Sequence, residues 1–110
     1  MKLNKEKVIS AIQKVDGLIR TDYYLNGECC ALGACLVDIG WEEKNERFDD
    51  INGCFIGTCD DALNNLIEEF GGNTAQWSKI QIKNDRSNYD SQLARKESVI
   101  QFVNDMPEAE

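Results

Sequence analysis

Cys29–Val37 (CCALGACLV) are nine consecutive uncharged residues, bounded by Glu28 and Asp38. A helix on a protein surface has one polar face, so an unbroken apolar run predicts a helix that other elements surround. The carboxylate of Glu28 suits a helix N-terminus and Gly40 suits a helix end, so we expect the helix to run from about Glu28 to Ile39. Its small residues would let neighbouring backbones approach closely: Ala31, Gly33 and Ala34.

Apolar residues at helical spacing predict three more helices, over about 4–19, 58–70 and 91–104. Asn4 and Thr58 are candidate N-caps, because a short polar side chain at that position accepts a bond from a free backbone N–H. Asp16-Gly17 is an alternative end for the first of these helices, and Gly71-Gly72 ends the second. The last helix is expected to use one apolar face: Leu93, Val99, Ile100, Val103 and Met106.

Two short segments have features of strands. In 52–57 (NGCFIG) a turn signal precedes apolar residues, and in 79–83 (KIQIK) Ile80 and Ile82 alternate with polar residues. We therefore expect at most a two-stranded β element, from 53–57 and 79–83. Asn26-Gly27 is a further turn signal, located before the apolar helix.

These elements predict a mainly α fold, with about four helices around the buried CCALGACLV helix, which the first, third and last helices flank. The short β element leaves an α+β fold as the alternative. A chain of 110 residues suits one domain with its own core, and we assign residues 1–106 to it. The sole proline, Pro107, opens an acidic tail over 107–110 that we expect to be frayed.

The net charge of −8 is unevenly distributed. Residues 1–20 contain five basic and two acidic residues, 21–70 contain two and twelve, and 71–110 contain five and six. An acidic middle repels phosphate backbones and attracts basic surfaces, so a basic protein partner is favoured over direct nucleic-acid binding. Solubility alone is the alternative interpretation. The candidate partner-binding residues are Glu42, Glu43, Glu46, Asp49 and Asp50.

The chain contains no histidine. Ser-His-Asp and Cys-His catalysis, HExxH zinc chemistry and Cys/His zinc fingers are therefore excluded within it. The many carboxylates single out no general acid with its base, so a non-enzymatic function is favoured and no cofactor is expected.

The five cysteines are an odd number, which favours free thiols over a disulfide framework. Four of them have a spacing that resembles a thiolate zinc site: Cys30, Cys35, Cys54 and Cys59. In a helix, however, Cys30 and Cys35 would point roughly 140° apart, at about 100° per residue. Core thiols are the favoured interpretation. The alternative is a metal site, or a reactive Cys29 or Cys30 at a helix N-terminus.

Aromatic residues on both sides of the predicted central helix are candidate walls of a small-molecule pocket: Tyr23, Tyr24 and Trp41. No N-terminal segment has the features of a secretion signal, and no apolar run is long enough to span a bilayer. We therefore expect a cytoplasmic protein that does not bind membranes.

The segments 27–36 (GECCALGACL) and 80–85 (IQIKND) are similar to elements of a diffuse set of small, uncharacterised bacterial and phage proteins. Those proteins have a G-x-x-C-x-LGA-L core segment and an I-x-x-x-ND element before a C-terminal amphipathic helix. The resemblance implies a small α-rich domain from a phage or mobile element, and it implies no activity. With the acidic charge, it favours an accessory or inhibitor protein that binds a basic or nucleic-acid-binding protein. The matching residues are expected at core and turn positions: Cys30, Leu32, Gly33, Ala34, Asn84 and Asp85.

Overall fold

The computed structural model describes residues 2–20, 24–25, 28–41, 60–85 and 89–106. In these ranges it has five helices and one antiparallel pair of short strands, which confirms a small, mainly α domain. The elements are α1 (Lys5–Gln13), β1 (Tyr24–Leu25), β2 (Glu28–Cys29), α2 (Ala31–Asp38), α4 (Asp60–Phe70), α5 (Thr74–Asp85) and α6 (Gln92–Asp105). The predicted tail, 107–110, lies outside the described residues.

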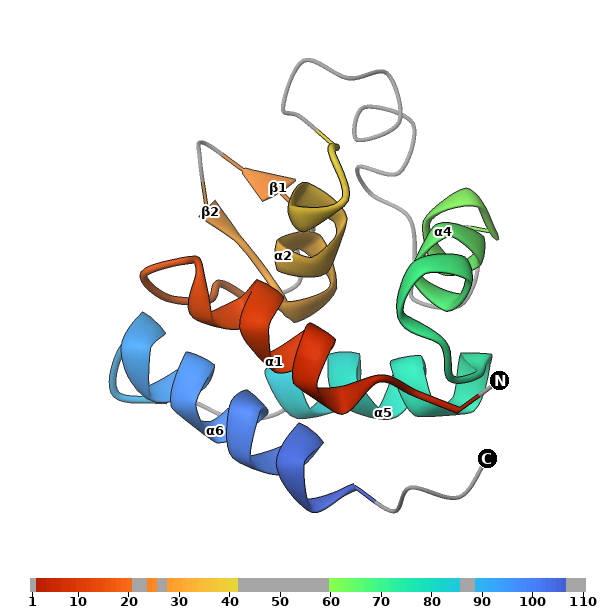
Figure 1. Cartoon of the computed structure of the whole chain (residues 1–110). Coiled ribbons are helices and arrows are strands. Elements are labelled where there is room, and N and C mark those ends of the chain that lie inside the picture. The colour runs from red at the N-terminus through yellow and green to blue at the C-terminus, as the bar shows by residue number, and fades with distance from the viewer. Residues whose placement is uncertain (1, 21–23, 26–27, 42–59, 86–88, 107–110) are drawn as a thin grey trace.

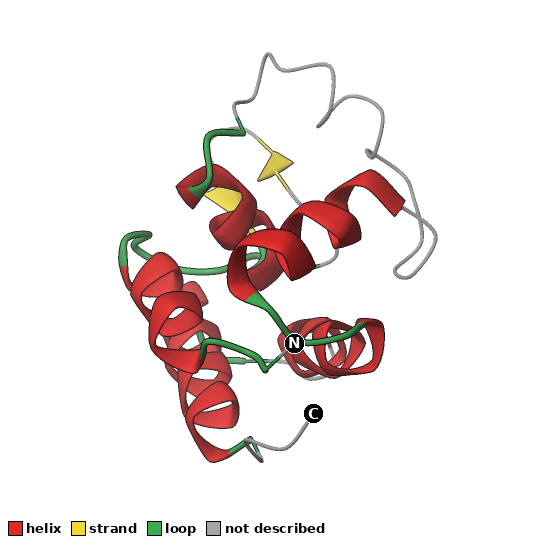
Figure 2. Ribbon diagram, turned by 45° about the vertical axis from the view of Figure 1, so that its right-hand side comes forward, coloured by secondary structure: helices red, strands yellow, loops and turns green. Residues whose placement is uncertain are grey.

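The helix α2 is the centre of the packing, as Figures 1 and 2 show. It packs against α1, α4, α5 and β2, whereas α6 packs mainly against α1 and α5. The prediction of a buried helix is confirmed, because most of α2 is inaccessible to solvent. We expected the last helix to flank α2, but α6 lies beneath α1 and α5 in Figure 1. The helix α5 packs against α2 in its place. The buried residues of α2 are Ala31, Leu32, Gly33, Ala34, Cys35 and Leu36.

The start of α2 differs from the prediction by three residues. The helix begins at Ala31, and Cys30 is its N-cap, with the thiol sulfur 3.5 Å from the Gly33 backbone N. The preceding pair, Glu28–Cys29, is the strand β2, which pairs with β1 in the register Tyr24–Cys29 and Leu25–Glu28. A two-residue connection of sequence Asn-Gly favours such a hairpin, and this preference overrides the extension of the helix.

The prediction of a strand over 79–83 is wrong, because these residues are helical within α5. The helix α5 has a capping box at its start. The Gln76 N–H donates to the Asn73 side chain (2.9 Å), and the Asn73 N–H donates to the Gln76 side chain (3.0 Å). Three of its five buried residues have amide side chains, so a search for apolar residues does not find the helical period. The buried residues are Gln76, Trp77, Ile80, Gln81 and Asn84. The other predicted strand, 53–57, lies outside the described residues.

The helix α1 begins where predicted, since the Asn4 side chain accepts from the Lys7 N–H (3.1 Å). It ends at Gln13, earlier than Ile19, and the chain then turns so that Leu18 is buried. The turn lies close to α6: a Cβ on Gly17 would be 2.6 Å from the Cβ of Gln92. A side chain at position 17 would therefore displace the first turn of α6, and glycine suits this contact.

The other two helices end and begin near their predicted positions. Gly71 and Gly72 follow α4 with φ of 81° and 82°, a left-handed conformation that favours glycine. The predicted N-cap of α4, Thr58, lies outside the described residues. Ser91 caps α6 by accepting from the Ala94 N–H (3.0 Å). Val99, Val103 and Met106 are buried as expected, but the expectation for Leu93 is wrong, because that side chain is 51% exposed. No helix in the described ranges is both long enough and apolar enough to cross a membrane.

Candidate functional site

Most of the residues predicted to bind a partner, a metal or a small molecule lie outside the described residues: Tyr23, Glu42, Glu43, Glu46, Asp49, Asp50, Cys54 and Cys59. Of the proposed pocket walls, Tyr24 is in β1 and Trp41 follows α2 directly. The backbone N–H of Trp41 donates to the Leu36 carbonyl (3.0 Å), and the residue is only 2% exposed. Trp41 is thus part of the core that covers the C-terminal end of α2.

The three described cysteines are free and buried: Cys29, Cys30 and Cys35. Burial, with the nearby charge of Glu28, raises the pKa of Cys29 to about 11. Burial raises the pKa of Cys30 to about 12 and that of Cys35 well above its ordinary value. The thiolate is the nucleophile and the metal ligand, so these shifts oppose both roles at neutral pH. Among the described residues, no group of three or more histidine, cysteine or acidic side chains could hold a metal ion.

A buried polar network joins the start of α2 to the end of α5. The Cys30 thiol donates to the Gln81 side-chain oxygen (3.4 Å), and the Gln81 amide donates to Asp85 (2.9 Å). The Asn84 side chain accepts from the Ala31 N–H (3.1 Å) and donates to the Ile19 carbonyl (2.9 Å). The two segments that carry the sequence resemblance are therefore in direct contact. Sequence reasoning expected Asn84 in a turn, whereas it is a fully buried helical residue.

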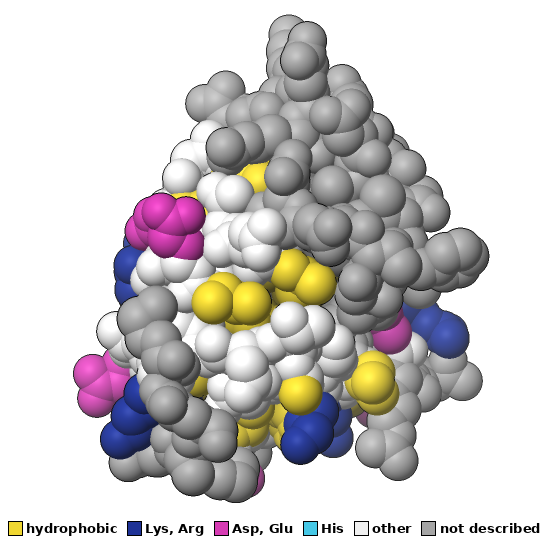
Figure 3. Space-filling model, turned by 90° about the vertical axis from the view of Figure 1, so that its right-hand side faces the viewer, with side chains coloured by type: hydrophobic (Ala, Val, Ile, Leu, Met, Phe, Trp, Pro, Cys, Tyr) yellow, Lys and Arg dark blue, Asp and Glu magenta, His cyan; other side chains and the backbone are white. Residues whose placement is uncertain are grey.

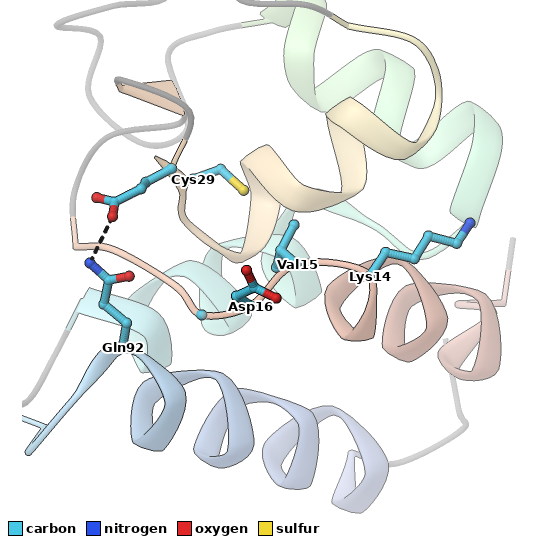
Figure 4. A pocket seen from close by; sticks show the side chains of 7 residues that line it. Lys14, Val15, Asp16, Cys29 and Gln92 are labelled. Carbon is cyan, nitrogen blue, oxygen red and sulfur yellow. Dashed lines mark hydrogen bonds between the residues drawn. The ribbon is translucent and has the colours of Figure 1, made fainter.

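An open cavity of about 320 Å³ lies beside Cys29, between the end of α1, the strand β2 and the start of α6 (Figure 4). Gln92 donates to the Glu28 carboxylate across its rim (3.3 Å). The Lys14 side chain extends away from the other labelled residues and pairs with Asp38. The carboxylates of the cavity are those of Asp16 and Glu28, both on exposed residues. Nothing in the sequence analysis indicated this cavity, because it joins three distant segments.

Basic side chains from distant helices bind the C-terminal ends of four helices. Lys7 donates to the Glu69 carbonyl of α4 (2.8 Å), and Lys5 donates to the Asn104 carbonyl of α6 (3.0 Å). Arg95 donates to the carbonyl of Asn84 at the end of α5. A fourth donor, Lys96, reaches the Gln13 carbonyl of α1 (3.5 Å). Positive charge at these ends offsets the negative ends of the helix dipoles.

Comparison of the chain with protein-family models, with curated proteins and with solved structures finds no match in any of the three.

Proposed function

We propose that the protein is a non-enzymatic acidic interaction protein that binds a basic protein, such as a nucleic-acid-binding protein of the cytoplasm. The observation that carries this proposal is the separation of charge along the chain. Residues 21–70 contain twelve acidic and two basic residues, a balance of −10. Three lysines of the basic N-terminal segment are bound within the domain: Lys5, Lys7 and Lys14.

The densest acidic segment connects Trp41 to α4. Its residues, 42–59, include five acidic and two basic residues, and two more acidic residues, Asp60 and Asp61, open α4. The segment begins directly after the buried Trp41 and leads into α4, so both of its ends adjoin the packed core. In Figure 3 the described part of one face carries both basic and acidic side chains around small apolar groups. The connecting segment and the start of α4 therefore form a continuous run of acidic sequence.

Carboxylates that are concentrated in one part of a chain can attract a basic surface and imitate a phosphate backbone. The cavity beside Cys29 supports the same proposal on a smaller scale, because Val15 and Cys29 provide apolar walls next to the Asp16 and Glu28 carboxylates. A lysine or arginine side chain would complement both parts of this lining, because it has an aliphatic stem and a cationic end. An accessory or inhibitor protein of a phage or mobile element would use such a surface to occupy a nucleic-acid-binding site.

The experiment is a fluorescence anisotropy titration of a labelled oligolysine peptide, at low and at high salt. The test variant reverses Glu42, Glu43, Asp49 and Asp50 to lysine. The control variant makes the same change at four exposed acidic residues of the helical frame: Glu6, Asp90, Glu97 and Asp105. Both variants raise the net charge from −8 to zero. We expect the test variant to lose peptide binding by tenfold or more, and the control variant to lose far less.

The salt dependence of peptide binding is the second measurement, since exposed charges are screened beyond about 8 Å at physiological ionic strength. Binding by the parent protein should weaken steeply as salt rises, mainly through a slower association rate. Equal losses in the two variants would show that only the net charge matters, and the proposal of a specific acidic surface would be wrong.

A further inference from the structure

A second cavity, of about 260 Å³, shares Gln92 in its lining with the acidic cavity beside Cys29. It is formed by the segment that leaves α1, the residues before α6 and the first turn of α6. Two arginines from these distant segments line it together with a tyrosine and a serine. The lining residues are Leu18, Ile19, Arg20, Tyr89, Ser91, Gln92 and Arg95.

The guanidinium group of Arg95 is held in place by two contacts. It donates to the carbonyl of Asn84, and its central carbon is 4.7 Å from the centre of the Tyr89 ring. The Tyr89 ring is fixed in turn, because its hydroxyl donates to the Lys83 carbonyl (2.9 Å) and accepts from Ser98 (3.2 Å). The bond to Asn84 uses one of the five N–H donors of the guanidinium. An arginine held in this way loses little side-chain entropy when it binds a further group.

The rest of the lining adds positive potential and donors. Arg20 adds a second guanidinium to the lining, from the same segment as the apolar residues Leu18 and Ile19. The Ser91 oxygen accepts from the Ala94 N–H, so its hydroxyl hydrogen can point to a ligand. Because α6 has 14 residues, its N-terminus adds the positive end of a helix dipole.

We propose that this arginine cavity binds the carboxylate or phosphate group of a small molecule. Two guanidinium groups and a hydroxyl match the acceptor oxygens of either oxyanion. The net charge of −8 disfavours an extended polyanion, whereas a single oxyanion inside the cavity would contact a lining that contains both arginines. This site is independent of the proposed binding of a basic partner.

The experiment is an NMR titration of the labelled protein with inorganic phosphate and, separately, with acetate, each against sodium chloride at equal ionic strength. We expect saturable shifts at the amides of Ser91 and Gln92 and at the side-chain N–H of Arg95 with at least one of the two oxyanions. Arg20→Gln should weaken this binding by tenfold or more. Lys79→Gln removes the same charge from an exposed residue outside the cavity and should leave the binding unchanged.

Arg95→Lys is the second variant, because a lysine can still reach the Asn84 carbonyl but lacks the planar fork. We expect it to remain folded by circular dichroism and to bind the oxyanion at least fivefold more weakly. Shifts that do not saturate with either oxyanion, or that chloride reproduces, would overturn the proposal. Equal effects of Arg20→Gln and Lys79→Gln would also overturn it, since general screening would then explain the shifts.

Discussion

The two ends of the helices are stabilised in different ways. At four helix starts, a side chain accepts from the backbone N–H three residues further along, and these pairs are Asn4 with Lys7, Cys30 with Gly33, Asn73 with Gln76, and Ser91 with Ala94. At four helix ends, the carbonyls accept from a basic side chain of another helix. The last turns of α1, α2, α4 and α6 contain no basic residue of their own.

This difference separates local from tertiary stabilisation. A helix start can be completed by its own N-cap, so it is encoded within four residues of sequence. The ends of these helices depend on lysines and arginines that become neighbours only when the domain folds. The cation at each end both donates a hydrogen bond and offsets the helix dipole. Variants at the two kinds of position should therefore differ in magnitude and in salt dependence.

The largest effect is expected at Asn84, which connects a helix start to a helix end. Asn84→Ala removes the partners of the Ala31 N–H and the Ile19 carbonyl, both in the polar network. Each buried polar group left without a partner costs about 1–3 kcal/mol, so we expect a loss of about 2–4 kcal/mol in urea unfolding. Ile82→Ala is the control on the same helix, because Ile82 is 53% exposed and should cost under about 1 kcal/mol. A loss for Asn84→Ala no larger than that of the control would contradict a stabilising role for the network.

Alkaline pH should weaken the start of α2, where the N-cap is a thiol. The pKa of Cys30 is raised from 9.0 to about 12, so the folded protein keeps this proton above pH 9 while the unfolded chain releases it. The unfolded state then binds fewer protons, and the free energy of unfolding falls as the pH rises. For one such thiol the loss is about 1 kcal/mol at pH 10.

Cys30→Ser keeps an N-capping side chain and removes this titration. Between pH 8 and pH 10, unfolding of this variant should lose about 1 kcal/mol less stability than unfolding of the parent protein. Parallel pH profiles for the two proteins would show that Cys30 ionises equally in the folded and unfolded states.

Lys5 tests a helix end directly. Its ammonium group donates to the carbonyls of Asn104 (3.0 Å) and Met106 (2.9 Å), about 100 residues further along the chain. Lys5→Met removes both bonds and the charge, and we expect a loss of about 1–2 kcal/mol in thermal or urea unfolding. High salt should reduce this loss, because part of it is electrostatic. Lys79→Met, at an exposed position, should change stability by less than about 0.5 kcal/mol.

Asn4, the neighbour of Lys5, tests a helix start. Asn4→Ala removes the acceptor for the Lys7 N–H and should cost about 1 kcal/mol. Because the bond joins neutral groups, the loss should be the same at low and at high salt, unlike the loss for Lys5→Met. Asn4→Asp retains an acceptor and should restore most of the stability. Identical salt dependence for the Asn4 and Lys5 variants would contradict the distinction between local starts and tertiary ends.

Sequence reasoning succeeded where the signal was short-range or strongly apolar. The burial of α2, the N-cap Asn4 and the stop at Gly71-Gly72 were predicted and are confirmed. The helix α5 was missed because Gln81 and Asn84 occupy its buried face, so its apolar residues do not repeat with a helical period. The start of α2 was misplaced because Glu28 and Cys29 suit a helix start and a hairpin equally well.

By itself the sequence determined which helix is central, where three helices start or stop, and how the charge is divided along the chain. These features follow from apolar runs, caps and glycines, which act within a few residues. Only the tertiary structure decided which basic side chain binds which helix end and that Asn84 supports α2. It also made Gln92 a lining residue of both an acidic and a basic cavity. The physical reason is that these contacts join segments up to about 100 residues apart, and no periodicity within either segment records the other.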